Sequence, residues 1–180
     1  MNVRLRPLIL DDLSTIFAWS QDEVFCRACG WTSGLTKDRT DAFWTRLIEQ
    51  PAADFLRLGI EAEGRLVGYA DLANLDREIG TGELGLAICP SSMWGHGLGR
   101  ASGGLMLQHG FGELNLNHIW AEVHAPNVRS LALVERLGFR QTDTRSEQDW
   151  FEGRLVDLIR FDLSRDDFQA QTGGFTGSRP

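Results

Sequence analysis

The stretch Trp94-Gly95-His96-Gly97-Leu98-Gly99-Arg100 decides the fold assignment of this 180-residue chain. Three glycines alternate in it, after an apolar run typical of a strand and before a run typical of a helix. Glycine tolerates positive φ and carries no side chain, so successive backbone N–H groups can converge on one point at a helix N-terminus. The helix dipole adds positive potential at the same place. The stretch therefore predicts a cradle for a phosphate or pyrophosphate group.

Two common nucleotide-binding patterns do not fit this cradle. The dinucleotide fingerprint G-x-G-x-x-G needs a third glycine where this chain has Arg100, or Ser102 in the other register. The triphosphate pattern needs a lysine after the glycines, and no lysine follows them. A third pattern, Q/R-x-x-G-x-G/A at the start of a helix, fits except that Trp94 stands in the first position.

A second motif follows about 28 residues later, where Asn127-Val128-Arg129-Ser130 precedes Leu137-Gly138-Phe139. Together the two motifs resemble the GNAT superfamily of acyl-CoA-dependent N-acetyltransferases. Within it they resemble the ribosomal-protein N-terminal (alanine/serine) acetyltransferase branch. The likeness extends from Leu5-Arg6-Pro7-Leu8 through Glu83-Leu84-Gly85 to Asp157, and so covers most of the chain.

The predicted fold class is α/β, an α+β arrangement with a mixed sheet. The resemblance implies a mostly antiparallel central sheet with one splayed parallel strand pair, flanked by about four helices. We expect one acetyltransferase domain over residues 1–165 and a flexible C-terminal tail over 166–180. The patterns predict strands at 3–6, 55–60, 65–70, 83–89, 119–124, 140–143 and 154–163, and helices at 11–19, 36–50, 98–113 and 127–137.

The resemblance also implies acetyl-CoA as cosubstrate. Backbone groups of Ala87, Ile88 and Cys89 would pair with the pantetheine arm, and Asn127 would contact the same arm, with Ser130 on the same helix face. Arg100 would add a charge-assisted contact to the pyrophosphate, whereas His96 would contribute only its backbone. The cradle residues expected to bind the cofactor are Trp94, Gly95, His96, Gly97, Leu98, Gly99 and Arg100.

Acetyl transfer to an amine needs a group that removes a proton from the amine. We expect Glu122 to be this base, because related enzymes carry a glutamate five residues before the asparagine. Glu83 is the second candidate for the base. Glu122 could instead have a purely structural role, in a salt bridge to a nearby arginine. His124 shares a face with Glu122 by strand alternation. The backbone N–H of Ile88 is the expected oxyanion donor.

The leaving thiolate also needs a proton. Many relatives supply it from a tyrosine seven residues after the asparagine, and this chain has Val134 there. Ser130 or a water molecule is the expected substitute.

The acceptor is expected between the first two helices and the late strands. Aromatic residues can line such a groove, although at helical spacing they belong to a core more often than to a pocket. An acidic mouth would attract a cationic amine. The aromatic candidates are Trp19, Trp31, Trp44, Trp150 and Phe151, and the acidic ones are Asp22, Glu23, Asp149 and Glu152.

Charge and composition limit the other functions. The net charge of −7 disfavours nucleic-acid binding and favours cationic partners. The sequence predicts no signal peptide, no membrane span and no metal site, and we expect a cytoplasmic monomer or homodimer. Cys26-Arg27-Ala28-Cys29 lacks the context of a zinc or thioredoxin-like motif, so Cys26, Cys29 and Cys89 are expected to be plain thiols.

The expected function is therefore acetyl-CoA-dependent acetylation of a primary amine, either a protein N-terminal α-amine or a small amine. Two alternatives remain open. One is a small-molecule N-acetyltransferase of the polyamine or aminoglycoside type. The other is a non-catalytic acyl-CoA-binding module.

Overall fold

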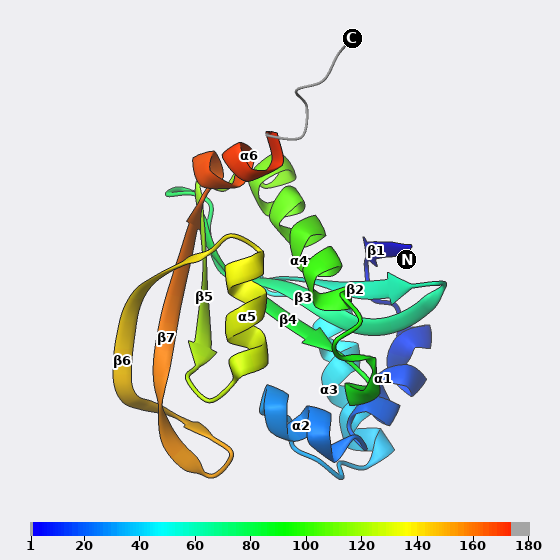
Figure 1. Cartoon of the computed structure of the whole chain (residues 1–180). Coiled ribbons are helices and arrows are strands. Elements are labelled where there is room, and N and C mark those ends of the chain that lie inside the picture. The colour runs from blue at the N-terminus through cyan, green and yellow to red at the C-terminus, as the bar shows by residue number, and fades with distance from the viewer. Residues whose placement is uncertain (1, 174–180) are drawn as a thin grey trace.

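One seven-stranded sheet forms the centre of the computed structural model, which describes residues 2–173 (Figure 1). The strand order is β1-β2-β3-β4-β5-β7-β6, and only β4 and β5 run parallel. The predicted mixed sheet is therefore confirmed. The strands are β1 (Val3–Arg6), β2 (Leu56–Ala62), β3 (Arg65–Asp76), β4 (Thr81–Ile88), β5 (His118–His124), β6 (Arg140–Phe151) and β7 (Arg154–Ser164).

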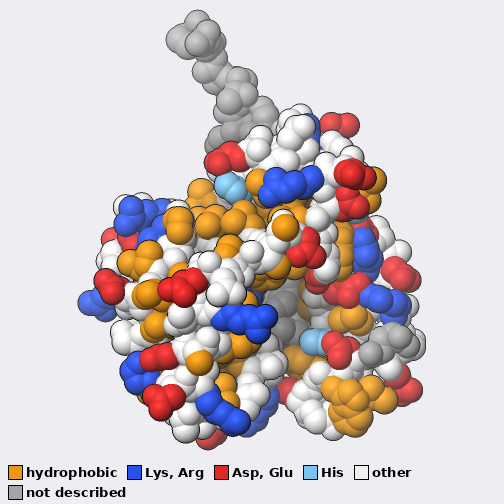
Figure 2. Space-filling view, turned by 180° about the vertical axis from the view of Figure 1, so that it is seen from behind, with side chains coloured by type: hydrophobic (Ala, Val, Ile, Leu, Met, Phe, Trp, Pro, Cys, Tyr) orange, Lys and Arg blue, Asp and Glu red, His pale blue; other side chains and the backbone are white. Residues whose placement is uncertain are grey.

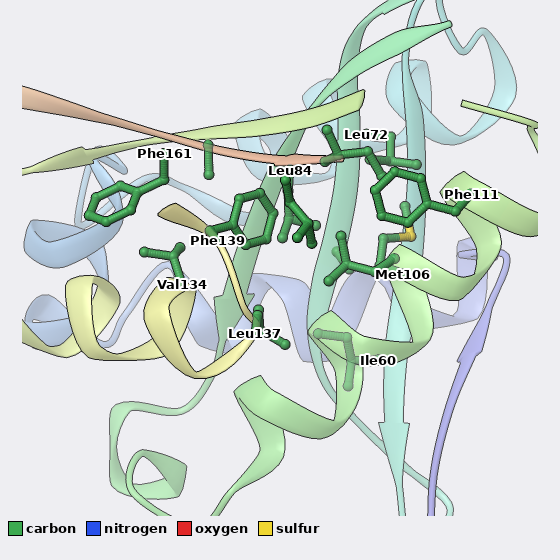
Figure 3. Close-up of a cluster of buried hydrophobic side chains, with 14 of the residues drawn as sticks. Ile60, Leu72, Leu84, Met106, Phe111, Val134, Leu137, Phe139 and Phe161 are labelled. Atoms are coloured by element: carbon green, nitrogen blue, oxygen red, sulfur yellow. The ribbon is translucent and has the colours of Figure 1, made fainter. Parts of the chain in front are cut away.

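Helices cover both faces of this sheet. One buried cluster joins the sheet to α4 and α5, and Figure 3 shows part of it. A second cluster joins the other face to α1, α2 and α3, with Trp19, Phe25 and Trp44 at its centre. The helices are α1 (Leu13–Trp19), α2 (Glu23–Cys29), α3 (Lys37–Glu49), α4 (Leu98–Gln108), α5 (Val128–Arg136) and α6 (Arg165–Gly173).

Two of these helices lie where no helix was expected. The region between the first two predicted helices contains α2, which the Asp22 side chain caps and which buries Phe25 and Cys26. The expected tail, 166–180, begins inside α6, where Phe168 packs against Phe111 with ring centroids 5.2 Å apart. Positions 174–180 lie outside the described residues. Both short helices depend on distant contacts, which local sequence patterns do not reveal.

The last hairpin is longer than expected. The strand predicted at 140–143 continues to Phe151 and pairs with β7 along its length, interrupted by register shifts. One shift lies between Arg145 and Asp149, and Glu147 within it has a φ of 46°. In Figure 1 this hairpin extends beside α5 and brings its tip toward α2.

The parallel pair of strands is splayed, as predicted. The β4–β5 pairing runs only from Thr81–Glu83 on β4 to His118–Trp120 on β5. Beyond these positions the two strands part. The sheet is therefore open in its middle, between the end of β4 and the end of β5.

Candidate active site

A cavity of about 750 Å³ occupies the gap between β4 and β5. Its walls come from the ends of both strands, the start of α4, one face of α5, the end of α2 and the tip of the β6–β7 hairpin. Figure 2 shows the molecule hollowed near the middle, with a basic side chain on one rim and a histidine on the other. Segments far apart in the chain therefore meet at one opening.

The edge of β4 that faces the gap is available for hydrogen bonding. The Cys89 N–H donates to the Val67 carbonyl at 2.9 Å, and alternation in an antiparallel pair directs the backbone of Ala87 toward β3 as well. The backbone groups of Leu86 and Ile88 therefore face the gap. Of the residues expected to pair with the pantetheine arm, Ala87 and Ile88 line the cavity, whereas Cys89 is fully buried and does not.

Trp94 holds the end of this strand. Its indole N–H donates to the Ile88 carbonyl at 2.7 Å, which leaves the Ile88 N–H directed at the gap. The guanidinium of Arg129 lies over the Trp94 ring, 4.2 Å from its centroid. The tryptophan in the first motif position thus joins β4 to the start of α5.

The three glycines of the cradle have two different roles. Gly95 and Gly97 have φ of 83° and 80°, in the left-handed region that favours glycine, and Gly97 is the N-cap of α4. Gly99 instead allows close packing, because a Cβ there would lie 3.2 Å from a methyl group of Leu133 on α5. The first-turn N–H groups of Leu98, Gly99 and Arg100 are available, since intrahelical bonding to Gly97 begins with the N–H of Ala101.

Basic side chains line the cavity. Arg100 is one of them, as expected, whereas the His96 side chain is exposed, contacts the Met93 carbonyl at 3.2 Å and does not line it. Three further arginines, for which no role was predicted, also line the cavity: Arg27, Arg129 and Arg136. Arg27 comes from α2, which was itself not predicted.

The second motif caps α5. Asn127 is the N-cap residue, and its side-chain oxygen accepts a hydrogen bond from the Ser130 N–H at 3.1 Å. Asn127, Ser130 and Val134 all line the cavity. The motif therefore lies opposite the open edge of β4, as the resemblance implies.

The two carboxylates predicted as bases have different surroundings. Glu122 lines the cavity from β5, and its side chain forms an ion pair with Arg145 of β6. Glu83 lies where β4 and β5 are still paired and does not line the cavity. It accepts a hydrogen bond from the Asn74 amide at 2.7 Å, and burial raises its pKa. The structure therefore contains the salt bridge between Glu122 and an arginine that was given as the alternative to a role as base.

His124 has a partner that was not predicted. Its Nε2 lies 2.9 Å from a carboxylate oxygen of Asp149, and its ring lies against Phe151 with centroids 4.8 Å apart. His124 and Phe151 line the cavity, and Trp150 lines it with two-thirds of its surface exposed. The hairpin tip therefore forms one rim of the cavity.

The inner wall contains a buried ion pair that the sequence analysis missed. Asp71 of β3 accepts from Arg57 Nε at 2.7 Å and from Arg57 Nη2 at 2.6 Å. Burial raises the pKa of Asp71 even though Arg57 lowers it. Next to it the Tyr69 hydroxyl accepts from the Trp31 indole N–H at 3.0 Å, and both Tyr69 and Asp71 line the cavity.

Several expected acceptor residues lie elsewhere. Trp19 and Trp44 are each 3% exposed and belong to the second core cluster. These two aromatic residues therefore form part of the core and do not line the groove. Of the four acidic candidates only Glu152 lines the cavity, while Asp149 supports its rim through His124. Asp22 instead accepts hydrogen bonds from the Phe25 N–H at 3.0 Å and the Ser91 N–H at 2.7 Å.

Asp22→Ala is expected to lower the free energy of unfolding by about 2 kcal/mol, because it removes a helix cap and the link from α2 to the loop after β4. Burial opposes ionisation of Asp22, but the bonds from Phe25 and Ser91 hold its pKa below the ordinary value. This stabilisation is present above an unfolded-state pKa of about 4 and is lost as pH falls through the folded-state pKa. Urea unfolding at pH 7 and at about pH 3 measures it.

Thr36→Ala is the matched control for this variant. Thr36 caps α3 by accepting from the Arg39 N–H at 3.4 Å and carries no charge. Thr36→Ala should lower the free energy of unfolding by less than Asp22→Ala does, and by the same amount at both pH values. An Asp22→Ala deficit that stays constant between the two pH values would contradict the role assigned to the ionised carboxylate.

Comparison with known proteins agrees with this geometry. The acetyltransferase (GNAT) domain family matches residues 2–140, so the chain belongs to this family. Uncharacterized N-acetyltransferase p20 of Bacillus licheniformis is 27% identical over 109 residues, 61% of this chain and 61% of that protein. Putative ribosomal N-acetyltransferase YdaF of Bacillus subtilis (strain 168) is 28% identical over 117 residues, 63% of each. The chain thus spans less than two thirds of the length of these curated relatives.

Solved structures share the fold. The crystal structure of spermidine N-acetyltransferase from Vibrio cholerae in complex with CoA and spermine has a TM-score of 0.80 at 22% identity. The match covers 92% of this chain and 97% of that one. Within residues 2–173, no helix is long and apolar enough to cross a membrane. The same residues contain no group of three or more His, Cys, Asp or Glu placed to hold a metal ion.

Proposed function

We propose that the chain is an N-acetyltransferase that transfers the acetyl group of acetyl-CoA to a primary amine. The observation that carries this proposal is the meeting of the open edge of β4 and the glycine cradle in one cavity. A strand edge suits an amide-containing arm, and a helix N-terminus suits a pyrophosphate. Acetyl-CoA has both groups in one molecule.

The residues present fit this cosubstrate. Backbone groups of Leu86 would bind the pantetheine arm, and the N–H groups of Leu98 to Arg100 would bind the pyrophosphate. The cavity-lining arginines would balance the phosphate charge, with Arg129 held against Trp94. Acetyl-CoA supplies the activated acetyl group as a thioester.

The protein then has to handle two protons. On β5, Glu122 and His124 line the cavity and can take a proton from the amine. Ser130 lines the cavity opposite them and is the proposed proton donor to the leaving sulfur, because Val134 stands in the family's tyrosine position. The N–H of Ile88 faces the gap and is the proposed oxyanion donor.

The acceptor is proposed to be a protein N-terminal α-amine or a small amine. A relative named for ribosomal acetylation favours the first, and the fold shared with spermidine N-acetyltransferases favours a polyamine as the second candidate. The acceptor half of the cavity includes Asp71, Glu122 and Glu152. Arg57 and Arg145 balance two of these carboxylates, which leaves Glu152 to favour a cation.

An amine panel tests the proposal. The full chain is mixed with acetyl-CoA and, separately, with N-terminal peptides of ribosomal proteins, spermidine and an aminoglycoside, and free thiol is measured over time. We expect thiol release that depends on the amine. CoA binding by calorimetry together with no thiol release on any amine would instead support a non-catalytic acyl-CoA-binding module.

A further inference from the structure

Several side chains of the cavity wall can accept a proton, and they differ in their surroundings. A base must lie beside the reacting atoms, and the open edge of β4 places these atoms in the gap between β4 and β5. The described side chains that line the cavity and can accept a proton are Cys29, Tyr69, Asp71, Glu122, His124 and Glu152. Cys29 and Glu152 belong to the end of α2 and to the hairpin tip, and not to the two strands.

Three of the remaining groups already have side-chain partners. Both oxygens of Asp71 accept from Arg57, and Glu122 forms its ion pair with Arg145. The guanidinium groups occupy hydrogen-bonding positions of these carboxylates that an acceptor amine would need. The Tyr69 hydroxyl accepts from the Trp31 indole, and burial raises its pKa, so it stays protonated.

The contacts of His124 leave one ring nitrogen available. A carboxylate can only accept a hydrogen bond, so the contact with Asp149 places the hydrogen on Nε2 and leaves the lone pair on Nδ1. The buried Phe151 ring lies against the imidazole and restricts its rotation.

We propose that His124 accepts the proton of the acceptor amine, with Asp149 as the positioning residue for its ring. This inference rests on the proposed acetyl transfer. In the step, the amine nitrogen bonds to the thioester carbonyl carbon and the carbon–sulfur bond breaks, its electron pair going to sulfur. His124 Nδ1 takes the proton that leaves the nitrogen. The sulfur takes a proton from Ser130 or water, and the proton held by His124 then returns through solvent to that donor, so both groups regain their starting states.

Other charged groups also face this imidazole. Glu122 precedes it on the same face of β5, and Arg160 of β7 lies opposite Glu122 in the sheet register. The hairpin contributes Arg145, Asp149 and Glu152, and Arg27 lies in the α2 wall of the cavity. Asp149 is the one of these within hydrogen-bond distance of the ring, and the contact holds the pKa of that carboxyl low.

The test uses the full chain and the panel amine that it acetylates fastest. Thiol release gives kcat and KM between about pH 5 and pH 9, across the range in which histidines titrate. The variants are His124→Gln, Asp149→Asn and Glu122→Gln. The matched control is His118→Gln, because His118 lies at the other end of β5, pairs with Asp162 at 3.2 Å and does not line the cavity. Calorimetry with CoA checks that each variant is folded.

We expect His124→Gln to lower kcat about 100-fold with CoA binding unchanged, and to remove the rise in rate across the histidine range. Asp149→Asn should lower kcat about tenfold with KM and CoA binding unchanged, because the imidazole loses the carboxylate that orients its ring. Glu122→Gln should keep the rise, and His118→Gln should match the wild type. Imidazole added to His124→Ala should restore part of the rate.

Two results would overturn the inference. If His124→Gln keeps the rise in rate with pH, or if Glu122→Gln loses it, His124 is not the base, while acetyl transfer itself stands. If the wild-type protein releases no thiol with any amine of the panel, the proposed function fails, and the inference fails with it.

Discussion

Replacing Gly97 with valine is expected to weaken CoA binding by about 10²- to 10⁴-fold. Gly97 has a φ of 80° at the N-cap of α4, and a β-branched residue strongly disfavours this conformation. The cradle would have to open, and the N–H groups of Leu98 and Gly99 would no longer converge. Each charge-assisted hydrogen bond to a phosphate is worth about 1.5–3 kcal/mol, so losing two accounts for the expected change.

Calorimetric titration with CoA measures this effect, and Gly64→Val is the matched control. Gly64 has a φ of 76° in the turn between β2 and β3, and space is open around its missing Cβ, as it is at Gly97. The control should cost similar folding stability and leave CoA affinity unchanged. Equal CoA affinity in Gly97→Val and the wild-type chain would show that the cradle is not part of the CoA-binding site.

The parts of the fold that could be predicted from sequence are those with local signals. Alternating glycines mark the cradle, Asn127 marks the cap of α5, and the apolar runs of β4 and β5 mark the strands on either side of the gap. Each depends on residues within one turn or one strand. Local periodicity is sufficient to find such features.

The parts that could not be predicted depend on contacts between distant residues. Arg57 and Asp71 are 14 residues apart, and His124 and Asp149 are 25 apart, so neither pair leaves a pattern in the sequence. The run from Arg140 to Phe151 is mostly polar, and it forms a strand because it pairs with β7. The register of that hairpin places Asp149 beside His124.

The cavity wall contains charges of both signs. Four arginines line it, and the carboxylates Asp71 and Glu122 are each paired with a further arginine, Arg57 and Arg145. Pairing keeps these carboxylates from holding an acceptor ammonium tightly in its unreactive, protonated form.

The buried pair of Arg57 and Asp71 gives the second large prediction, for folding stability. Arg57→Met is expected to lower the free energy of unfolding by about 3–5 kcal/mol at pH 7, because it leaves a buried carboxylate without a partner. The Asp71 side chain is 10% exposed, and the Arg57 guanidinium also lies 4.2 Å from the centroid of the Tyr69 ring. Urea unfolding measures the loss.

The loss in Arg57→Met should decrease as the pH falls. Burial already raises the pKa of Asp71, and removing Arg57 takes away the main opposing influence, so the folded-state pKa rises further. A carboxyl group with a raised folded-state pKa favours folding below its unfolded-state value, and this contribution is lost as pH rises through the folded-state pKa. The variant should therefore be closest to the wild type in acid and furthest from it above neutral pH.

Two further variants separate the buried charge from the loss of packing. Arg4→Met breaks an ion pair with Glu61 in which the Arg4 side chain is 65% exposed, so water can replace the lost partner and the loss should be much smaller. Arg57→Met combined with Asp71→Leu removes both charges and should recover much of the stability, because no unpaired carboxylate remains. The loss of unfolding free energy in the double variant could instead equal the sum of the losses in the two single variants. In that case the packing of the Arg57 side chain against Tyr69 and Trp44 stabilises this wall, and the ion pair does not.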